Sequence, residues 1–293
     1  MDRSVSVVIA TYNRSGVIGR AIESVLAQTY KDFEIVVIDD GSTDSTRDVV
    51  TAYGDRVRYY YQQNTGNYPA RNRGIREARG RWIAWLDDDD QWHPDKLALQ
   101  VEKIKQLPEP GFLWCNGYRG GVPYRDPGAP SGFFESMREI VAQPSAWLMS
   151  RSLFEKIGGF DTAYPTGGDT AFVMKALIRG IKIYYMKDLL VVWDNRVGRV
   201  SSFGPQTLVN REKRYRDFFD FIRKDRVFHF RYMCTMGRDA VRLGDKKRAR
   251  RYFLKAFSLQ PWKPEILARY FRAFGRPSKP WPSKPLTTGP KEV

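Results

Sequence analysis

Apolar and polar residues alternate along the first ninety residues with a period that changes from segment to segment. Short runs of β-branched and aromatic residues predict β-strands at 4–10, 33–38, 56–61 and 81–86. Between these runs, apolar residues recur at helical spacing at 17–26, 43–53 and 68–79. Strands that alternate with helices at this pitch form a parallel sheet with helices on its faces. The pattern therefore predicts an α/β fold with a mainly parallel sheet flanked by helices.

Polar clusters follow three of the predicted strands. They are TYNR at 11–14, DDGSTD at 39–44 and a run of aspartates at 87–90. Ligands of such sheets bind outside the carboxyl ends of the strands, so the three clusters should face one crevice. Neither a GxGxxG nor a GxxxxGK[ST] pattern is present to cradle phosphates. A divalent metal held by carboxylates is another way to bind a phosphate group.

The aspartate run itself calls for a cation. Neighbouring carboxylates repel one another, and the repulsion persists in a folded protein only where water, Lys, Arg or a metal relieves it. The run stands between the apolar segment RWIAWL and Trp92. A run that is merely solvated is the poorest explanation, because these flanking residues should be buried.

Five ordered motifs carry a resemblance to a known family. VSVVIATYNR, VVIDDGSTD, ARNRGI, WLDDDDQW and GGFD, in this order, resemble family 2 glycosyltransferases of the GT-A fold, which build bacterial surface polysaccharides. The resemblance covers about residues 4–195. It implies a Rossmann-like GT-A domain and an inverting transferase of the hexosyltransferase type. Such an enzyme moves a sugar from a nucleotide-sugar, here a UDP-sugar, to a hydroxyl of a glycan or lipid-linked acceptor.

The resemblance also implies nucleotide contacts. The ring of Tyr12 would stack on the base beside Thr11, and Asp39 would accept a hydrogen bond from the base, which favours uracil. The implied nucleotide-binding residues are Thr11, Tyr12, Arg14, Asp39, Arg71 and Asp88. The structural alternatives are a loop aromatic for Tyr12 and a solvated helix charge for Arg71. Residues 40–44 are assigned to a turn and a helix N-cap.

A metal site is implied within the aspartate run. The family's metal-binding pair corresponds either to Asp88 and Asp89 or to Asp87 and Asp89, and the register stays open. Asp89 belongs to both choices and is the predicted ligand of Mn²⁺ or Mg²⁺, with Asp87 as the second candidate.

Direct displacement of a nucleoside diphosphate also requires a base for the acceptor proton. In the family, GGFD precedes an acidic pair at the start of a helix, and the Asp of that pair is the base. Asp169 holds this position here, but Gly168 stands where the family usually has Glu. The alternative for Asp169 is a helix N-cap. Acceptor contacts are expected from the Gly- and Pro-rich loop 118–134, from Trp147, and from Arg196 and Arg199 in a lid at 194–203.

Charge divides the chain unevenly. The formal net charge is +16, and residues 211–293 carry 23 Lys and Arg against 8 Asp and Glu. This asymmetry indicates an anionic partner, such as the inner face of a membrane. We expect a catalytic domain at 1–210, with a nucleotide-binding half at 1–110 and an acceptor-binding half at 111–210. A basic helical extension resembling one tetratricopeptide-type hairpin should occupy 211–275, followed by a disordered tail at 276–293.

The remaining composition concerns compartment and alternative functions. The two cysteines do not indicate a disulfide framework, and neither a signal pattern nor a long apolar run is present, so we expect a cytoplasmic protein that binds the membrane peripherally. Two other classes stay open: a non-catalytic nucleotide-sugar-binding protein and a nucleic-acid binder that uses the basic tail. The sequence also leaves the oligomeric state open.

Overall fold

The computed structural model describes residues 4–107, 111–123, 143–194 and 204–261. The chain forms two compact units, Met1–Phe228 and His229–Val293, and each is described by itself. The first unit continues past residue 210, where the sequence analysis ends the catalytic domain. The predicted disordered tail at 276–293 lies outside the described residues.

The first part of the chain follows the predicted alternation of strands and helices. Its strands are β1 (Val5–Thr11), β2 (Phe33–Asp39), β3 (Arg58–Tyr61), β4 (Trp82–Trp85) and β5 (Gln91–Trp92). Its helices are α1 (Ile18–Leu26), α2 (Thr46–Thr51), α3 (Asn67–Glu77) and α4 (Lys96–Lys105), with a 3₁₀ turn at Gly54–Arg56.

The rest of the first unit completes the sheet and adds helices. Its strands are β6 (Phe112–Arg119), β7 (Val122–Pro123), β8 (Trp147–Ser150) and β9 (Ile183–Trp193), with a 3₁₀ turn at Pro144–Ala146 before β8. Its helices are α6 (Arg151–Ile157), α7 (Gly168–Ile178), α8 (Pro205–Asp217) and α9 (Phe219–Ile222).

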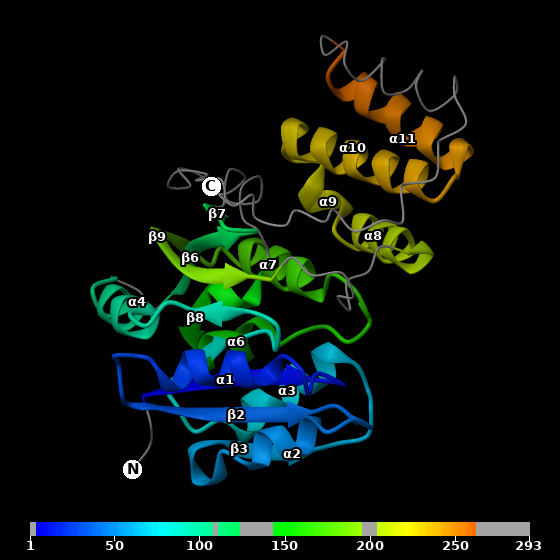
Figure 1. Ribbon diagram of the computed structural model, residues 1–293. Helices are drawn as coiled ribbons and strands as arrows, with labels where there is room; N and C mark the ends of the chain where they lie inside the picture. The colour runs from blue at the N-terminus through cyan, green and yellow to red at the C-terminus, as the bar shows by residue number, and fades with distance from the viewer. Residues whose placement is uncertain (1–3, 108–110, 124–142, 195–203, 262–293) are drawn as a thin grey trace, which may run out of the picture. The chain divides into compact units, whose positions relative to one another are not determined.

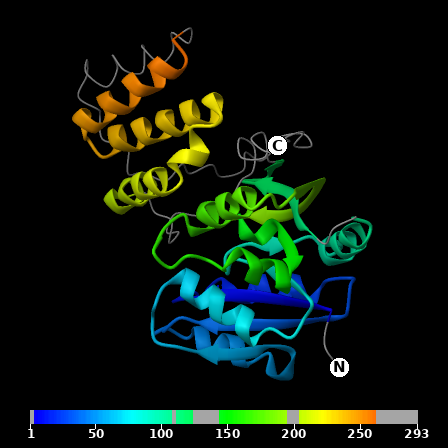
Figure 2. The same ribbon diagram turned by 180° about the vertical axis from the view of Figure 1, so that it is seen from behind.

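Within the described residues these strands form one mixed sheet. Its order is β3-β2-β1-β4-β8-β6-β9-β5, and β7 pairs with β6. The four strands from β3 to β4 are mutually parallel, whereas β8 is antiparallel to both of its neighbours. Figure 1 and the reverse view in Figure 2 show the blue N-terminal strands at one side of the unit and the green strands beyond them. The predicted α/β fold with helices flanking the sheet is confirmed, and the sheet is mixed, because β8, β5 and β7 add antiparallel pairings to the parallel ones.

The sheet positions the polar clusters through an apolar core. The central strand β1 is buried along most of its length, and α1 covers the sheet with Ile18, Ala21, Ile22 and Val25. Helix α3 approaches β1 closely at Gly74, where a methyl group would lie 2.3 Å from a Val8 methyl carbon. Because these contacts fix α1 and α3 on the strands, the loops at the carboxyl ends have fixed starting points.

Two predicted segments differ from the structure. The helix predicted at 43–53 is shorter, because the backbone N–H of Thr43 donates to the Asn13 side chain instead of starting a helix. The predicted loop at 118–134 begins with a hairpin: Gly120 and Gly121 adopt positive φ angles of 61° and 76° between β6 and β7. Residues 124–134 lie outside the described residues.

The second unit contains a helical hairpin. Helix α10 (Arg226–Arg242) begins just before the unit boundary, and a turn at Gly244 leads into α11 (Lys246–Leu259). The Phe253 ring packs against Gly237, where a methyl group would lie 2.6 Å from a ring carbon. In the described part of the chain no helix is long and apolar enough to cross a membrane.

Candidate active site

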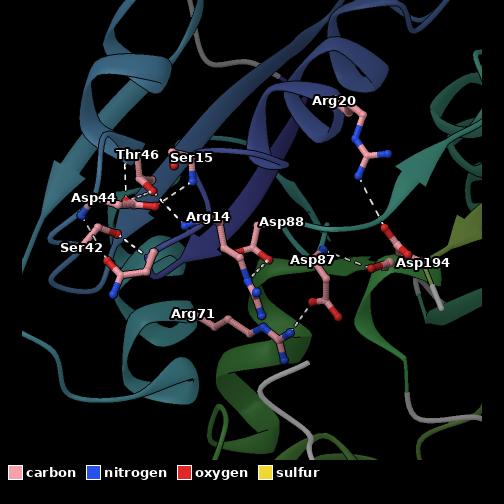
Figure 3. A network of polar contacts seen from close by, with 12 residues as sticks. Arg14, Ser15, Arg20, Ser42, Asp44, Thr46, Arg71, Asp87, Asp88 and Asp194 are labelled. Atoms are coloured by element: carbon pink, nitrogen blue, oxygen red, sulfur yellow. Dashed lines mark hydrogen bonds and ion pairs between the residues drawn. The ribbon is translucent and has the colours of Figure 1, made fainter. Parts of the chain in front are cut away.

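The loops that follow β1 and β2 are joined by hydrogen bonds at the carboxyl edge of the sheet. The Asn13 side-chain oxygen accepts a hydrogen bond from the Thr43 N–H at 2.7 Å, and the backbone N–H of Asn13 donates to Ser42 Oγ at 2.8 Å. Asn13 has a φ of 52°, a left-handed conformation that asparagine tolerates better than most residues. Asp44 accepts hydrogen bonds from Thr46 and Ser15, which against the effect of burial lower the pKa of Asp44 to about 2 (Figure 3).

Asp39 and Asp40 lie at the end of β2 with different partners. The buried Asp39 carboxylate accepts hydrogen bonds from the Ser42 N–H at 2.8 Å and the Tyr59 hydroxyl at 2.7 Å. Asp40 accepts hydrogen bonds from the N–H groups of Thr65 and Gly66, just before α3. Asp40 therefore fixes the entry to α3. Each Asp39 oxygen keeps a lone pair beside its partner, so the predicted contact with a base stays a prediction.

The predicted base-stacking residue is at the surface. Tyr12 follows β1 directly and is 42% exposed, whereas Thr11 is buried. Thr11 pairs with Asp39 in the parallel register of β1 and β2. Tyr12 is thus an exposed aromatic residue at the carboxyl end of β1, and its stacking on a base stays a prediction.

The aspartate run forms a turn in which three carboxylates have identified partners. Asp87 forms an ion pair with Arg71 of α3, and Asp88 lies 3.6 Å from Arg14 Nε (Figure 3). Asp90 is buried and accepts hydrogen bonds from Ser145 Oγ at 2.7 Å and the Asp194 N–H at 3.0 Å. Two carboxylates of the run are thus paired with arginines, and Asp90 joins the turn to two other segments.

These partners do not fully compensate the negative charge. Burial, together with the charges of Asp89 and Asp87, raises the pKa of Asp88 to about 7 against the effect of Arg14. Burial and the charge of Asp87 likewise raise the pKa of Asp90. Carboxyl groups with raised pKa values mark a place where an additional cation would be stabilising.

The donor set suits a hard divalent cation. Among the residues that the structure describes, no group of three or more His, Cys, Asp and Glu side chains is arranged to hold a metal ion. Mg²⁺ and Mn²⁺ at nucleotide sites commonly take only one or two carboxylates and complete their shell with phosphate oxygens and water. The oxygens of the turn, with the raised pKa of Asp88, fit such a shared site.

Asp169 is the second residue of α7, and its carboxylate is only partly exposed. Its Oδ1 accepts hydrogen bonds from the Thr170 N–H at 2.7 Å and the Tyr68 hydroxyl at 3.4 Å. Burial raises the pKa of Asp169, while the charges of Arg71 and Arg214 lower it. The N-cap position belongs to Gly167, so Asp169 does not cap this helix.

Tyr68 gives a physical reason for Gly168. The Tyr68 ring is buried against Phe160, with 5.5 Å between the ring centroids. A methyl group on Gly168 would lie 2.8 Å from a carbon of the Tyr68 ring. The ring therefore occupies the space that a Glu side chain at 168 would enter.

Of the individual residues predicted to contact the acceptor, Trp147 is the one that the structure describes. Trp147 is fully buried in β8, with its ring 4.8 Å from that of Phe112 and 5.8 Å from that of Phe172. Because its indole has no exposed surface to offer an acceptor, we correct the prediction and assign Trp147 to the core. Arg196 and Arg199 lie outside the described residues.

Sequence reasoning missed Tyr68, Ser145 and Arg214, which contact the predicted residues or the loop before Asp169. The proximity of Tyr68 to the ARNRGI motif was a usable signal. Arg214 had none, because it stands among other Lys and Arg residues of a basic segment.

Comparisons with known proteins agree on one group. The sequence family described as glycosyl transferase family 2 matches residues 6–158, more than half of the chain. A relative from Bacillus subtilis, described as the putative teichuronic acid biosynthesis glycosyltransferase TuaG, is 40% identical over 33% of this chain and 40% of its own length. The chain spans less than two thirds of two other curated relatives from Rickettsia, covering 33% and 62% of their lengths.

Solved structures show the same fold. Staphylococcus aureus TarS 1-349 in complex with UDP-GlcNAc matches with a TM-score of 0.62 at 18% identity, over 92% of this chain and 79% of that chain. The mannosyltransferase PcManGT of Pyrobaculum calidifontis, in complex with GDP-Man and Mn²⁺, matches with a TM-score of 0.56 at 20% identity, over 93% of this chain and 74% of that chain. The predicted GT-A fold is confirmed.

Proposed function

Because the chain belongs to glycosyl transferase family 2, we propose that it is an inverting enzyme that transfers a sugar from a UDP-sugar to a hydroxyl group. The observation that carries this proposal is the meeting of Asp87, Arg71 and Asp169 at one edge of the sheet. Arg71 pairs with Asp87 and also lowers the pKa of Asp169. Arg71 thus interacts both with Asp169, proposed to act on the acceptor, and with Asp87 in the turn proposed to bind the donor.

In the proposed reaction Asp169 acts as the general base. The acceptor hydroxyl attacks the anomeric carbon from the side opposite the nucleotide, and its proton passes to the Asp169 carboxylate. The bond between this carbon and the diphosphate oxygen breaks, and the electron pair leaves with UDP, so the configuration inverts. Arg71 and Arg214 favour the ionised form of Asp169, which burial disfavours.

The donor would lie along the carboxyl ends of β1, β2 and β4. Tyr12 would stack on the uracil, Asp39 would accept a hydrogen bond from it, and Arg14 would lie beside the diphosphate. Asp89 and Asp87 would hold Mn²⁺ or Mg²⁺, which when bound stabilises negative charge on the departing diphosphate. UDP-GlcNAc bound to TarS and Mn²⁺ bound to PcManGT support this assignment.

The acceptor is proposed to be a glycan or a lipid-linked saccharide of the cell surface. Support comes from the likeness to TuaG and, for the place of reaction, from the basic second unit. Five Lys and Arg side chains of α11 are exposed: Lys246, Lys247, Arg250, Arg251 and Lys255. At about 1 kcal/mol each near an anionic surface, they would contribute roughly 5 kcal/mol to peripheral membrane binding.

Tyr252 and Phe253 are buried within the second unit rather than available for insertion between lipids. For α11, membrane attachment is therefore proposed through charge, and 1 M salt, with a Debye length of about 3 Å, should weaken it. Co-sedimentation with anionic and neutral vesicles at low and high salt tests this; binding that ignores lipid charge contradicts it.

The transfer reaction is tested by a donor screen. The protein is incubated with UDP-GlcNAc, UDP-Glc, UDP-Gal and GDP-Man, each with Mn²⁺ and a glycan acceptor mixture, and nucleoside diphosphate release is measured. We expect release from a UDP-sugar that stops with EDTA. Tight UDP binding without release from any donor would support the non-catalytic alternative instead.

A further inference from the structure

Helix α8 lies after the segment that the family match covers, yet two of its buried side chains reach the loop before Asp169. Arg214 Nη1 donates a hydrogen bond to the Thr166 carbonyl oxygen at 2.7 Å, and Asn210 Nδ2 donates to Thr166 Oγ1 at 2.9 Å. Arg214 and Asn210 are each 3% exposed. Both residues therefore hold Thr166, which stands just before the start of α7.

The guanidinium of Arg214 lies directly against Gly167. A methyl group on Gly167 would lie 2.4 Å from Arg214 Nη1, so only glycine leaves room for this arginine. Gly167 has a φ of 72° and precedes Gly168 and Asp169, the first residues of α7. The cation is thus placed against the backbone that presents the Asp169 carboxylate.

Arg214 lacks a carboxylate partner of its own. In the part of the chain that the structure describes, it forms no ion pair, and its buried Nε has no hydrogen-bond partner. Its contacts are the neutral Thr166 carbonyl and the Tyr164 ring, whose centroid is 6.0 Å away. A buried guanidinium is costly unless a negative charge is near, and Asp169 is the carboxylate whose pKa it lowers.

The groups around Asp169 show why a second cation is needed. It is faced by Tyr68 and Arg71 of α3, by Arg214 of α8, and by the charge of Asp87 after β4. Arg71 is shared with Asp87, whose negative charge opposes ionisation of Asp169. Within this group of described residues, Arg214 is the cation that forms no ion pair with a carboxylate.

We propose that Arg214 is a positioning residue for the reaction: its guanidinium, bonded to the Thr166 carbonyl and packed against Gly167, fixes the start of α7 and places a positive charge beside the segment that presents the Asp169 carboxylate. The inference rests on the proposed role of Asp169 as the base. It gives a helix outside the matched family segment a direct part in that chemistry.

The test is the pH dependence of kcat/KM, measured by UDP release from the best donor of the screen described above. Removing a nearby positive charge raises the pKa of Asp169, so the acidic limb in Arg214→Gln should move to higher pH by about one unit. Activity should approach the wild-type value at alkaline pH, and Arg214→Lys should restore most of the original limb. The KM for the donor should stay unchanged.

Asn210→Ala is the matched control, because it removes the other buried tie to Thr166 without changing charge. If Arg214 only braces the loop, Asn210→Ala and Arg214→Gln will lower turnover alike and leave the acidic limb in place, which would overturn the proposal. Arg216→Gln removes an equal charge from a more exposed position of α8 and should leave the profile unchanged. Thermal unfolding of each variant separates a shifted limb from a misfolded protein.

The outcomes also separate this inference from the function on which it rests. An Asp169→Asn enzyme that keeps its turnover would remove Asp169 as the base. An inactive Asp169→Asn enzyme combined with an unshifted limb in both Arg214 variants would leave the proposed function standing and reject Arg214 alone.

Discussion

Glu34, at the amino end of the parallel strands, differs from the aspartates near β4 and α7 at the carboxyl end, although Asp44 at that same edge has a lowered pKa. At the amino end, Glu34 of β2 accepts hydrogen bonds from Ser6 Oγ at 2.5 Å, from the Arg79 N–H at 2.5 Å and from Arg58 Nη1 at 2.6 Å. Although burial opposes them, these partners lower the pKa of Glu34. At the carboxyl end, burial raises the pKa values of Asp88, Asp90 and Asp169 despite their partners.

This contrast separates stabilising from functional electrostatics within one sheet. A carboxylate with three donors contributes stability in the isolated protein. In a cluster of carboxyl groups with raised pKa values, the ionised form is unfavourable. It becomes favourable when a metal or a positively charged group of a substrate binds, and otherwise the carboxyl groups take up protons. The carboxyl end is therefore organised for a ligand, and the amino end for folding.

The largest expected effect concerns the base. Asp169→Asn should leave UDP affinity nearly unchanged and lower kcat by on the order of 100-fold or more, because the amide cannot accept the acceptor proton. Asp161→Asn is the control in the same segment: it loses the ion pair with Lys175, at 2.8 Å, and should keep most of its turnover. Near-normal turnover of Asp169→Asn would show that this carboxylate has only a structural role. It would then not differ in kind from Glu34 at the amino end.

The next largest expected effect is the dependence of UDP binding on a divalent cation at the aspartate turn. UDP should bind on the order of tenfold or more tightly with Mn²⁺ than with EDTA, since without a cation the diphosphate meets Asp87, Asp88 and Asp89. Asp89→Ala should abolish this difference and transfer, whereas Asp55→Ala, an exposed carboxylate elsewhere, should preserve both. Equal UDP affinity with Mn²⁺ and EDTA in the wild type would refute the metal assignment.

The amino end should respond in stability rather than in rate. Glu34→Gln removes the ion pair with Arg58 and should lower the free energy of unfolding by about 1 to 2 kcal/mol at neutral pH, with turnover unchanged. Because the folded-state pKa of Glu34 is lowered, its contribution is present above the ordinary value of 4.5 and is lost as the pH falls through the folded-state value. Urea unfolding at pH 7 and pH 3.5 measures this; a difference that grows in acid contradicts the sign.

The smallest effect provides the baseline for both ends. Asp220 and Arg223 form an exposed ion pair at 3.0 Å, with side chains 83% and 60% exposed. Asp220→Asn should change the free energy of unfolding by less than about 0.5 kcal/mol, because water screens the pair. A loss as large as that of Glu34→Gln would show that burial does not set the difference between the carboxylates.

Much of the architecture was predictable because it depends on local pattern. Runs such as FEIVVI can form buried strands and little else, and the helical spacing of Ile18, Ala21, Ile22 and Val25 allows only one apolar face. The shortened α2 was not predictable, since its start depends on Asn13, which is 30 residues away from Thr43. Trp147 was misassigned because its exposure depends on rings contributed by four other segments.

The order of the motifs, the sheet that brings their ends together and the kinds of side chain available there all follow from the amino-acid sequence. The pairing of Asp87 with Arg71 and of Asp88 with Arg14 depends on the folded chain. So does the contact of Arg214 with the carbonyl of Thr166, 48 residues before it in the sequence. The physical reason is that charge interactions depend on distance and burial in three dimensions. Neither quantity is written in the spacing of residues along the chain.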